Sequence, residues 1–448
     1  MTATPGQGAK FKAWLAGLGV LATNLQAATV EALLEEEDLP PQARRALELK
    51  AGLSKSSLAK YPKILATANS LGVVREILVY HRAHTGRFGG RGVQIQNLAR
   101  PLVLMSLVVT CLISCSYDTF KFFYDDLAIA LSSMLRAVII PRDGKKFLIA
   151  DFAQMEARVL AWLAGDDERL RLFAAGEDLY CYNASKLYNR TITKEDKDER
   201  FVGKVSDLSS GYQGGIAAIV RFAKTYRLKL KPLVSIILPG ATEKELESAE
   251  WSYLNTYLPQ CKRDKVKPVD KDIAFVADVL KQRWRKENST IVQFWGDLEV
   301  AAIEAVQTQL PVKIRNLTWF VNGQFLYCRL PSERCMAYPY PQLNKSGKLT
   351  YMFDDVQLGW IRVSTYGGKL AENITQAVQR DLLTDGILRI DPVYEIAFHV
   401  HDELIAEVPE EHDCLADFVE RMKVVPTWAE GVPIDVEGWE GKRYGKAA

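Results

Sequence analysis

The 448-residue sequence lacks several features that would place it in a specialised class of protein. Its seven cysteines are odd in number and scattered, and no Cys/His cluster has the spacing of a zinc site, so we expect reduced thiols in a cytoplasm. The N-terminal MTATPGQGAK has no apolar core of the signal-peptide kind. The net charge is only +2, so overall charge does not indicate a nucleic-acid binder, although a local basic cleft is compatible with it.

Long hydrophobic runs are also scarce. The longest, Leu102–Cys115, has 14 residues, which is shorter than the ~20 that a membrane-spanning helix needs. We therefore expect a buried helix or a pair of strands there and no membrane role. Hydrophobic residues still make up 48% of the chain and aromatic residues 10%, which is enough for a substantial core and excludes disorder as the main state. The length indicates roughly two to four domain-sized units, or one large multi-lobed enzyme.

The stretch Lys145–Asp166 is the most informative part of the sequence. The apolar run at residues 147–150 predicts a buried strand that ends at Asp151. From Gln154 the apolar residues take helical spacing, and Glu156 lies at the start of that helix. Carboxylates at a strand tip and at the start of the next helix suit a divalent cation, because magnesium prefers oxygen ligands. An aspartate at a strand end can equally be a turn former or a helix cap.

A loop rich in glycine and arginine follows a strand-like segment at residues 73–80. Its guanidinium groups, among them Arg87, suit phosphates, and the amides of Gln96 and Asn97 that follow suit base edges. The alternative is a merely basic surface loop. Upstream of this loop, residues 11–70 have helical spacing and helix start signals.

A second informative stretch predicts a helix that ends near Gly211. Arg200, Lys204, Leu208 and Tyr212 stand four residues apart, so they form one stripe along such a helix. Two cations followed by an apolar and an aromatic side chain could hold a triphosphate and stack a base, although such a stripe can also be a solvated face. Residues 222–290 are rich in lysine and arginine, and we expect an exposed subdomain or insertion there.

The C-terminal third predicts two hairpins and one long helix. Residues 318–341 alternate like strands, with Asn322-Gly323 at the turn. A helix follows Gly367 and Gly368. Residues 394–410 then form a tight hairpin whose tip carries His401, Asp402 and Glu403 instead of the glycine that such turns favour.

In this order, the Asp-x4-Glu-x-Arg strand and helix, the Arg-x3-Lys-x7-Tyr helix and the apolar-His-Asp-Glu hairpin resemble the polymerase region of the family A DNA polymerases, the DNA polymerase I family, and most of all its bacteriophage branch. The resemblance runs from about residue 11 to the C-terminal GWEGKRYGK. It implies an α+β, right-hand fold with an antiparallel-sheet palm, helical fingers and a truncated helical thumb. The implied parts are a partial thumb (1–70), palm (71–165), fingers with an insertion (166–310) and palm again (311–448).

The resemblance also implies the chemistry: template-directed addition of dNMPs to a primer 3′-hydroxyl. Asp151 and Asp402 would bind two magnesium ions, roughly 3.5–4 Å apart, that activate the 3′-hydroxyl and stabilise the leaving pyrophosphate. Manganese is an expected substitute for magnesium. Arg200 and Lys204 would hold the triphosphate, with Lys204 counted among the catalytic residues. The remaining implied contacts are to the incoming nucleotide and templating base (Glu156, Gln154, Leu208, Tyr212) and to the primer–template DNA (Arg87, Gln96, Asn97, Asn373, Gln376, His401, Glu403).

The sequence departs from the family pattern at several positions. Leu208 stands where bacterial members have Phe, and Gln213 replaces the usual Gly after Tyr212. Asn373 is one place off the expected asparagine, and Lys369 takes the place of an arginine. No paired acidic exonuclease motif precedes residue 72, so we expect no proofreading activity in this chain. The short thumb predicts weak binding to the duplex, since phosphate contacts supply most of the non-specific affinity.

We expect a monomer in the cytoplasm of a bacterial host, with primer–template DNA and dNTPs as partners and a separate exonuclease or clamp protein as further candidates. Two alternatives remain open at this level. One is a catalytically impaired primer–template binding remnant of such a polymerase, against which the two intact carboxylates speak. The other is a single-subunit RNA polymerase, against which Glu156 and the His401-Asp402-Glu403 hairpin speak.

Overall fold

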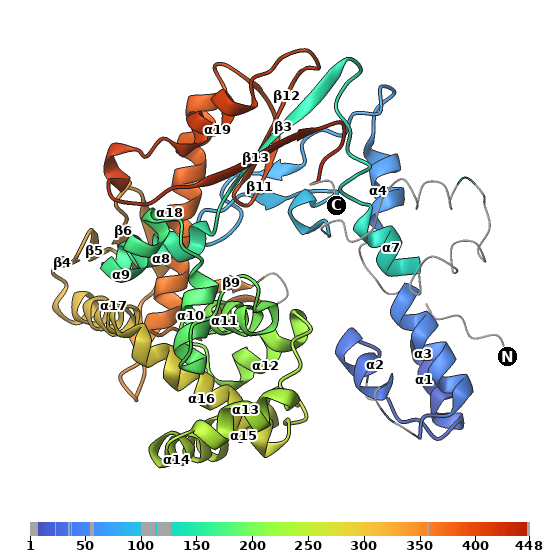
Figure 1. Ribbon diagram of the computed structural model, residues 1–448, viewed down its shortest axis with the longest axis vertical. Helices are drawn as coiled ribbons and strands as arrows, with labels where there is room; N and C mark the ends of the chain where they lie inside the picture. Colours follow the sequence, from blue (N-terminus) through green and yellow to red (C-terminus); the bar gives the residue numbers. More distant parts are fainter. Residues whose placement is uncertain are drawn as a thin grey trace.

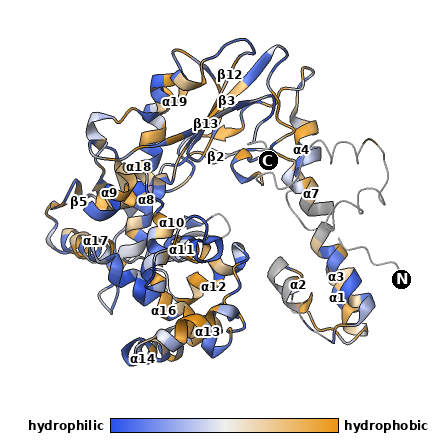
Figure 2. Cartoon of the chain, viewed as in Figure 1, coloured by the Kyte–Doolittle hydropathy of each residue, from blue (hydrophilic) through white to orange (hydrophobic). Residues whose placement is uncertain are grey.

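The computed structural model describes residues 8–22, 24–34, 36, 38–53, 58–99, 113, 127–355 and 358–445. In Figure 1 an antiparallel sheet lies at the top, a group of helices lies below it, and the first three helices lie apart on the right. The helices predicted between residues 11 and 70 are confirmed as α1 (Gly8–Gly17), α2 (Ala27–Leu34), α3 (Pro41–Leu53) and α4 (Lys60–Thr67). Phe11, Leu15 and Leu47 belong to a small core that α1 to α3 share. Figure 2 shows hydrophilic and hydrophobic residues mixed along α1 and α3, as expected of helices with one buried face.

The principal sheet has four antiparallel strands. Their order is β11 (Glu395–Val400), β12 (Glu403–Pro409), β3 (Lys145–Phe152) and β13 (Val436–Gly441). Strand β3 confirms the buried strand predicted at residues 147–150. Leu148 and Ala150 join a large core on one face of the sheet, and Phe147 and Ile149 join a smaller core on the other. Because both faces are covered, the strand is a continuous apolar run in the sequence.

Helices cover both faces of this sheet. The large core includes residues of α8 (Met155–Ala164), α17 (Ser289–Thr308), α18 (Gly367–Ile390) and α19 (Leu415–Lys423). Both α8 and α18 were predicted from their spacing. The smaller core includes residues of α4, of the turn η1 (Ile95–Asn97) and of the segment that follows α7 (Leu127–Ser133).

A helical lobe, defined here as α10 to α16 (residues 179–287), lies below the sheet in Figure 1. Helix α9 (Asp167–Ala174) connects α8 to it. The elements of the lobe are α10 (Leu179–Tyr188), α11 (Lys197–Ser210), α12 (Ile216–Thr225), η2 (Lys231–Leu233), α13 (Val234–Ile237), η3 (Leu238–Gly240), α14 (Glu243–Ser252), the π-helical turn η4 (Tyr253–Tyr257), α15 (Leu258–Asp264) and α16 (Lys271–Glu287).

The segment for which an exposed subdomain or insertion is predicted, residues 222–290, has a buried core along α16. This helix contacts α10, α11, α12 and α14, and Val276, Val279 and Trp284 are buried. The basic composition was misleading because most of these cations occupy exposed turns and outer helix faces, such as the segment from Lys262 to Lys267, while one face of α16 is apolar.

Two smaller sheets follow the helical lobe. One contains β4 (Val312–Ile314), β5 (Leu317–Asn322), β6 (Phe325–Arg329) and β7 (Cys335–Pro339), and the other contains β8 (Gln342–Leu343), β9 (Leu349–Asp355) and β10 (Gly359–Ser364). The predicted hairpin is confirmed, with a register shift of one residue at its turn. Asn322 pairs with Phe325, so the two loop residues are Gly323 and Gln324, and Gly323 has a φ of 58°.

The strand predicted at residues 73–80 is much shorter than expected. It forms only β1 (Leu78–Val79), which pairs with β2 (Gly89–Gly90). Glu76 has a φ of 55°, which interrupts the extended backbone before pairing can begin. Among the described residues, no helix is long and apolar enough to cross a membrane. The apolar run Leu102–Cys115 lies outside the described residues apart from Ile113. A last turn, η5 (Thr427–Ala429), precedes β13.

Candidate active site

The tight turn between β11 and β12 brings two predicted metal ligands to one end of the sheet. Val400 pairs with Glu403, so His401 and Asp402 form the turn itself. His401 has a φ of 53°, the left-handed conformation that a glycine would otherwise supply. The backbone N–H of Phe152 donates to the carbonyl of Asp402 (3.2 Å). Asp151, one residue earlier in β3, lies opposite Glu403 in the neighbouring strand.

The carboxylate of Asp402 is in an unfavourable electrostatic environment. Burial raises the pKa of Asp402 above its usual range, and the negative charges of Glu403 and Glu156 raise it further, while a backbone hydrogen bond and Arg87 oppose the shift. The Nε2 group of Gln379, on α18, donates to Asp402 Oδ2 (3.3 Å). Arg87 in turn donates to Gln379 Oε1. The turn is therefore linked through one amide to the arginine loop at residues 82–91.

Three predicted DNA contacts surround one small cavity beside this turn. Arg87, Gln96 and His401 all line it. The Nε2–H of His401 donates to the backbone carbonyl of Gln96 (3.1 Å). Both side-chain polar atoms of Gln96 are buried and have no hydrogen-bond partner among the described residues. Buried amides are nearly always hydrogen-bonded, so the side-chain amide of Gln96 is available to a hydrogen-bonding group of a bound molecule.

Other predicted DNA contacts already have partners within the protein. Glu403 is buried, forms an ion pair with Arg136 (3.4 Å) and accepts from the hydroxyl of Tyr444 (2.6 Å). Asn373 is also buried, and its Nδ2 donates to Tyr338 (3.4 Å). The side chain of Gln376 is half-buried and donates to Glu372. The side chain of Asn97 is exposed and donates to Gln94. Gln154 is exposed at the start of α8 and has a φ of 50°.

Tyr212 lies just past the end of α11, where the backbone of the helical lobe meets α18. A Cβ added to Gly368 would lie 2.6 Å from the Tyr212 carbonyl and 2.4 Å from Gln213 Cβ, so only glycine allows this approach. Burial raises the pKa of the Tyr212 hydroxyl, and Glu156, Glu372 and Arg87 lie close enough to influence it. Tyr212, Glu156 and Arg87 therefore belong to the same site as Asp402.

The structure shows how Gln213 is accommodated at the position where the family pattern has glycine. Gln213 has a φ of 66°, a left-handed conformation that glycine adopts without strain. Its Oε1 accepts from the backbone N–H of Gly368 (2.9 Å), one of the otherwise unpaired amides at the start of α18. This hydrogen bond offsets part of the conformational cost of a non-glycine residue there.

The predicted stripe on α11 is largely confirmed, since Arg200, Lys204 and Leu208 lie on the helix while Tyr212 follows it. Arg200 donates through Nε and Nη2 to Asp178 Oδ2 (2.9 and 2.7 Å). The Lys204 ammonium lies over the rings of Tyr180 and Tyr226, at 5.9 and 5.3 Å from their centres. Both cations are thus oriented by groups that the sequence analysis did not identify. Leu208 is half-buried.

Three residues of the site were missed from the sequence. Asp178 and Tyr180 belong to the start of α10, and Asp178 caps that helix by accepting from the N–H groups of Tyr180 and Cys181. The helix-cap pattern was visible, but nothing local connected it to α11. Gln379 lies three residues after Gln376, on a helix for which only the spacing of the family pattern had been considered.

The carboxylates at the turn have the chemistry that a divalent cation requires. No group of three or more His, Cys, Asp or Glu side chains arranged to hold a metal occurs among the described residues. The carboxylates of Asp151 and Asp402 would nevertheless offer oxygen ligands at one edge of the sheet, and a nearby positive charge would stabilise the ionised form of Asp402, whose pKa is raised. Magnesium usually takes one or two carboxylates and completes its shell with substrate phosphates and water. The residues therefore fit such an ion.

Comparison with known proteins identifies the family. Residues 26–219 match the family model described as DNA polymerase family A. Over 457 aligned residues the chain is 33% identical to the DNA polymerase of Bacillus phage SP02, which covers 99% of this chain and 63% of the phage protein. The chain belongs to DNA polymerase family A. A further relative, DNA polymerase I of Chloroflexus aurantiacus, is 36% identical over 70 residues, 16% of this chain and 7% of its own length.

A solved structure confirms the fold of this family A chain. The POL domain of Pol1 from M. smegmatis, in complex with DNA primer-template and dNTP, superposes with a TM-score of 0.58 at 16% identity, over 95% of this chain and 57% of that chain. The mixed helical and antiparallel-sheet fold predicted from the sequence is thereby confirmed, as is the resemblance to the phage branch. The chain spans less than two thirds of the length of the phage polymerase and of the Pol1 chain.

Proposed function

We propose that this chain is a template-directed DNA polymerase that extends a primer 3′-hydroxyl with dNMPs. The observation that carries the proposal is the backbone hydrogen bond between Phe152 and the Asp402 turn, which sets Asp151 and Asp402 side by side at the end of the sheet. The similarity to the phage DNA polymerase over nearly the whole chain supports it.

The proposed metal ligands are Asp151 and Asp402, and the proposed ions are two magnesium ions. When bound, such ions neutralise charge on the reacting phosphate and activate the attacking hydroxyl. Asp151 and Asp402 would hold them through carboxylate oxygens. Gln379 would hold one carboxylate oxygen of Asp402 by hydrogen bonding and thereby orient the other.

The remaining residues position the substrates. Arg200 and Lys204 would bind the triphosphate of the incoming dNTP, with Asp178 and Tyr180 holding them in place. Tyr212 would pack against the templating base, and Glu156 would exclude a ribose 2′-hydroxyl. DNA contacts are proposed for Arg87, Gln96 and His401, which line one cavity, and for Gln154, Asn97, Asn373, Gln376 and Glu403. Of these, Asn373 and Glu403 are buried and would act by supporting the residues that touch DNA.

The proposed division of the chain follows the sequence prediction. Residues 1–70 would form part of the thumb, 71–165 and 311–448 the palm, and 166–310 the fingers. The proposed partners are primer–template DNA and dNTPs, with a monomer as the active form. A bacterial cytoplasm is the proposed location, and a separate exonuclease or clamp protein remains a candidate partner.

Primer extension tests the proposal. A recessed DNA duplex is incubated with magnesium and four dNTPs, and the wild-type chain is compared with Asp402→Ala. We expect extension by the wild type and a loss of about 10³-fold or more in the variant, since a metal ion contributes several kcal/mol of transition-state stabilisation. Asp413→Ala, an exposed aspartate beyond β12, is the matched control and should extend normally.

Two other results would redirect the proposal. If neither chain extends the primer but both shift the duplex in a gel, the chain is a binding remnant of a polymerase. If ribonucleotides are incorporated as readily as dNTPs on a promoter-free template, an RNA polymerase is indicated and the proposed role of Glu156 is wrong.

A further inference from the structure

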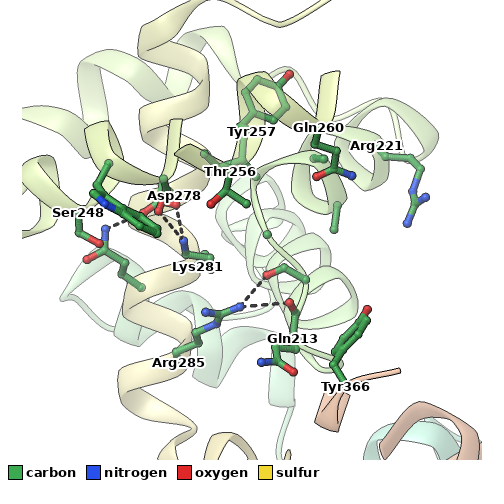
Figure 3. Close-up of a pocket in the computed structure, with 18 of the residues that line it drawn as sticks. Gln213, Arg221, Ser248, Thr256, Tyr257, Gln260, Asp278, Lys281, Arg285 and Tyr366 are labelled. Carbon is green, nitrogen blue, oxygen red and sulfur yellow. Dashed lines mark hydrogen bonds and ion pairs between the residues drawn. The ribbon is translucent and has the colours of Figure 1, made fainter. Parts of the chain in front are cut away.

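Arginine side chains hold two loops of the site by donating to backbone carbonyls. In the helical lobe, Arg285 lines a cationic cavity of about 1090 Å³ and donates through Nη2 to the carbonyls of Gln213 (3.2 Å) and Gly214 (3.1 Å), as Figure 3 shows. In the arginine loop, residues 82–91, two successive carbonyls are held in the same way by two other arginines. These two differ from Arg285 because they share a buried carboxylate.

The shared carboxylate is that of Asp381, on α18. Asp381 is only 5% exposed, and its Oδ1 accepts from Arg334 Nε (2.7 Å) and from Arg380 Nη1 (3.2 Å). Its Oδ2 accepts from the hydroxyl of Ser332 (2.5 Å). Arg380 is 6% exposed, so these groups are largely removed from water. Hydrogen bonds between such charged partners are strong, and they fix the orientation of both guanidinium groups.

Each of the two arginines also reaches the arginine loop. Arg334, in the turn between β6 and β7, donates through Nη2 to the carbonyl of Thr85 (3.1 Å) and to that of Ala377 on α18 (2.9 Å). Arg380 donates through Nε to the carbonyl of Gly86 (3.1 Å). A Cβ added to Gly86 would lie 2.6 Å from Arg334 Nη1, so the loop approaches this guanidinium as closely as a glycine allows.

The guanidinium of Arg380 packs on two aromatic rings as well. It lies 5.1 Å from the ring centre of Tyr80 and 5.3 Å from that of Phe88, and the two rings pack edge to face at 5.6 Å. Cation–π contacts are stronger for a guanidinium that is shielded from water than for an exposed one. Tyr80 precedes Arg87 in the chain and Phe88 follows it, so Arg380 contacts the chain on both sides of Arg87.

The arginine loop has little regular structure of its own. Strands β1 and β2, which pair across its base, have two residues each. Inside the loop, the N–H groups of Arg82 and Ala83 donate to the carbonyl of Arg87 (3.1 Å each), which closes a tight turn. These bonds shape the turn but do not join it to α18. Its place on that helix therefore depends on side chains such as Arg334 and Arg380.

We propose that Asp381 is a positioning residue for DNA binding. Through Arg334 and Arg380 it fixes the arginine loop on α18. The Arg87 guanidinium is thereby presented to primer–template DNA from one place, beside Gln379. The role of Arg87 as a DNA contact rests on the proposed function, whereas the anchoring of the loop rests on the contacts described above.

A charge-conserving variant tests this geometry without leaving a buried carboxylate unpaired. Arg334→Lys keeps a cation for Asp381, but a single ammonium group does not replace the planar fork that reaches the carboxylate and two carbonyls at once. The matched control is Arg389→Lys. Arg389 lies in the last turn of α18 and likewise joins a carboxylate, that of Asp385, to a backbone carbonyl, that of Arg421 (2.7 Å).

Fluorescence anisotropy measures the Kd of the full chain for a hairpin primer–template without dNTPs. We expect Arg334→Lys to raise Kd by about tenfold, the factor that one hydrogen bond to a charged group typically contributes, while Arg389→Lys binds like wild type. In steady-state extension, Arg334→Lys should raise KM for the primer–template and leave KM for dNTPs unchanged, since Arg200 and Lys204 belong to the helical lobe.

A double-mutant cycle separates positioning from a purely structural role. If Arg334 acts through Arg87, Arg334→Lys should change Kd by less than about twofold in a chain that already carries Arg87→Ala. A general loss of stability would weaken binding by the same factor in both backgrounds. Asp381→Asn leaves two buried guanidinium groups without their carboxylate, so it should show the same coupling to Arg87 together with a lower melting temperature.

The outcome is separable from the test of polymerase activity. Equal factors in the two backgrounds, or a wild-type Kd for Arg334→Lys, would overturn the anchoring proposal even if primers are extended. If Kd shows the coupling to Arg87 but the wild-type chain extends no primer, the loop is anchored as proposed and the polymerase proposal fails.

Discussion

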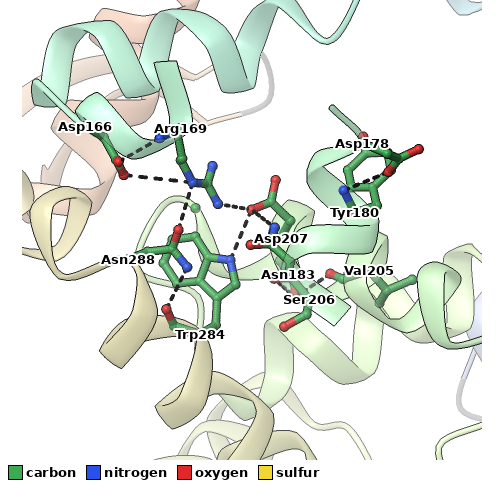
Figure 4. Close-up of polar contacts among 12 residues, drawn as sticks. Asp166, Arg169, Asp178, Tyr180, Asn183, Val205, Ser206, Asp207, Trp284 and Asn288 are labelled. Carbon is green, nitrogen blue, oxygen red and sulfur yellow. Dashed lines mark hydrogen bonds and ion pairs between the residues drawn. The ribbon is translucent and has the colours of Figure 1, made fainter. Parts of the chain in front are cut away.

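Two carboxylates, Asp207 in α11 and Asp402 in the turn between β11 and β12, have opposite surroundings. Asp207 Oδ1 accepts from Arg169, from Asn183 (3.0 Å) and from the indole of Trp284 (3.0 Å), as Figure 4 shows. Asp402 receives a long amide hydrogen bond from Gln379 and a backbone hydrogen bond, and the carboxylates of Glu403 and Glu156 lie near it together with Arg87.

The comparison distinguishes Asp207, whose charge is neutralised within the protein, from Asp402, whose charge is available to a ligand. Arg169 is 2% exposed and also donates to Asn288 (2.7 Å), so the Asp207 network joins α9, α10, α11, α16 and the start of α17 in one buried cluster. Its charges are balanced inside the protein. The charge of Asp402 is not balanced there, which is typical of groups that bind a cation or take part in chemistry.

The largest effect on stability should come from Asp207→Ala. The variant leaves the Arg169 guanidinium buried without its carboxylate, and breaking such a pair costs about 3–5 kcal/mol. Asp402→Ala should change the free energy of unfolding by less than about 1 kcal/mol, since it removes an unbalanced charge. Urea denaturation followed by circular dichroism measures both. Asp207→Asn, which keeps an acceptor for Asn183 and Trp284, should give an intermediate loss. Equal losses for Asp207→Ala and Asp402→Ala would remove the distinction between the two sites.

A smaller effect, on metal use, is expected from Gln379→Ala. Without the amide, the Asp402 carboxylate loses the hydrogen bond that orients it, and loss of such a supporting contact typically weakens metal affinity by about 10–100-fold. The magnesium concentration for half-maximal primer extension should rise by that factor, and Mn²⁺ binding measured by electron paramagnetic resonance should weaken in parallel. Thr384→Ala is the control, since Thr384 lies on the same helix and its hydroxyl donates to the carbonyl of Arg380 in its own turn. Unchanged Mn²⁺ binding in Gln379→Ala would show that the Gln379 amide positions Arg87 and does not orient the metal ligand Asp402.

The smallest effect is a pH dependence of stability at His399, in the same hairpin as Asp402. Burial, followed by the charges of Arg380 and His401, lowers the pKa of His399 to about 4. The unfolded chain binds a proton near pH 6.5, so the stability that neutral His399 contributes is complete above that value and is lost as the pH falls toward 4.

Between pH 6.5 and 5 this loss should amount to about 1.5 kcal/mol. Thermal unfolding of wild type and His399→Leu across this range measures it. The variant should lose less stability than wild type over this interval, and parallel curves for the two proteins would assign the acid sensitivity to other groups.

The local pattern of the chain predicted the elements that carry the site. Strand β3, helix α11 and the β11–β12 hairpin each follow from spacing and burial within one segment, so the place of Asp151, Arg200 and Asp402 on them was predictable. The left-handed φ of His401 was also implied, because a tight turn without glycine requires some residue to adopt it.

Contacts between distant segments were not predictable in this way. Arg87 and Gln379 stand 292 residues apart, and no periodicity connects them. Asp178 was recognisable as a helix cap, but its bond to Arg200 depends on how α10 packs against α11. The buried face of α16 could not be predicted from the lysine- and arginine-rich composition of residues 222–290, since composition does not reveal which face of a helix is apolar. The cationic cavity was missed for the same reason, because its walls come from several segments.

The strand order of the principal sheet also determines when the site can exist during synthesis. Strand β3 is flanked by β12 and β13, and about 250 residues separate the end of β3 from the start of β12. At ~5–20 residues per second, a ribosome takes about 12 to 50 seconds to produce that length. Throughout that interval the segment at residues 147–150 is apolar and has neither of its partner strands. We therefore expect this protein to depend on chaperones more than a chain whose central strand pairs with its nearest neighbour, and to aggregate when translation pauses between β3 and β12.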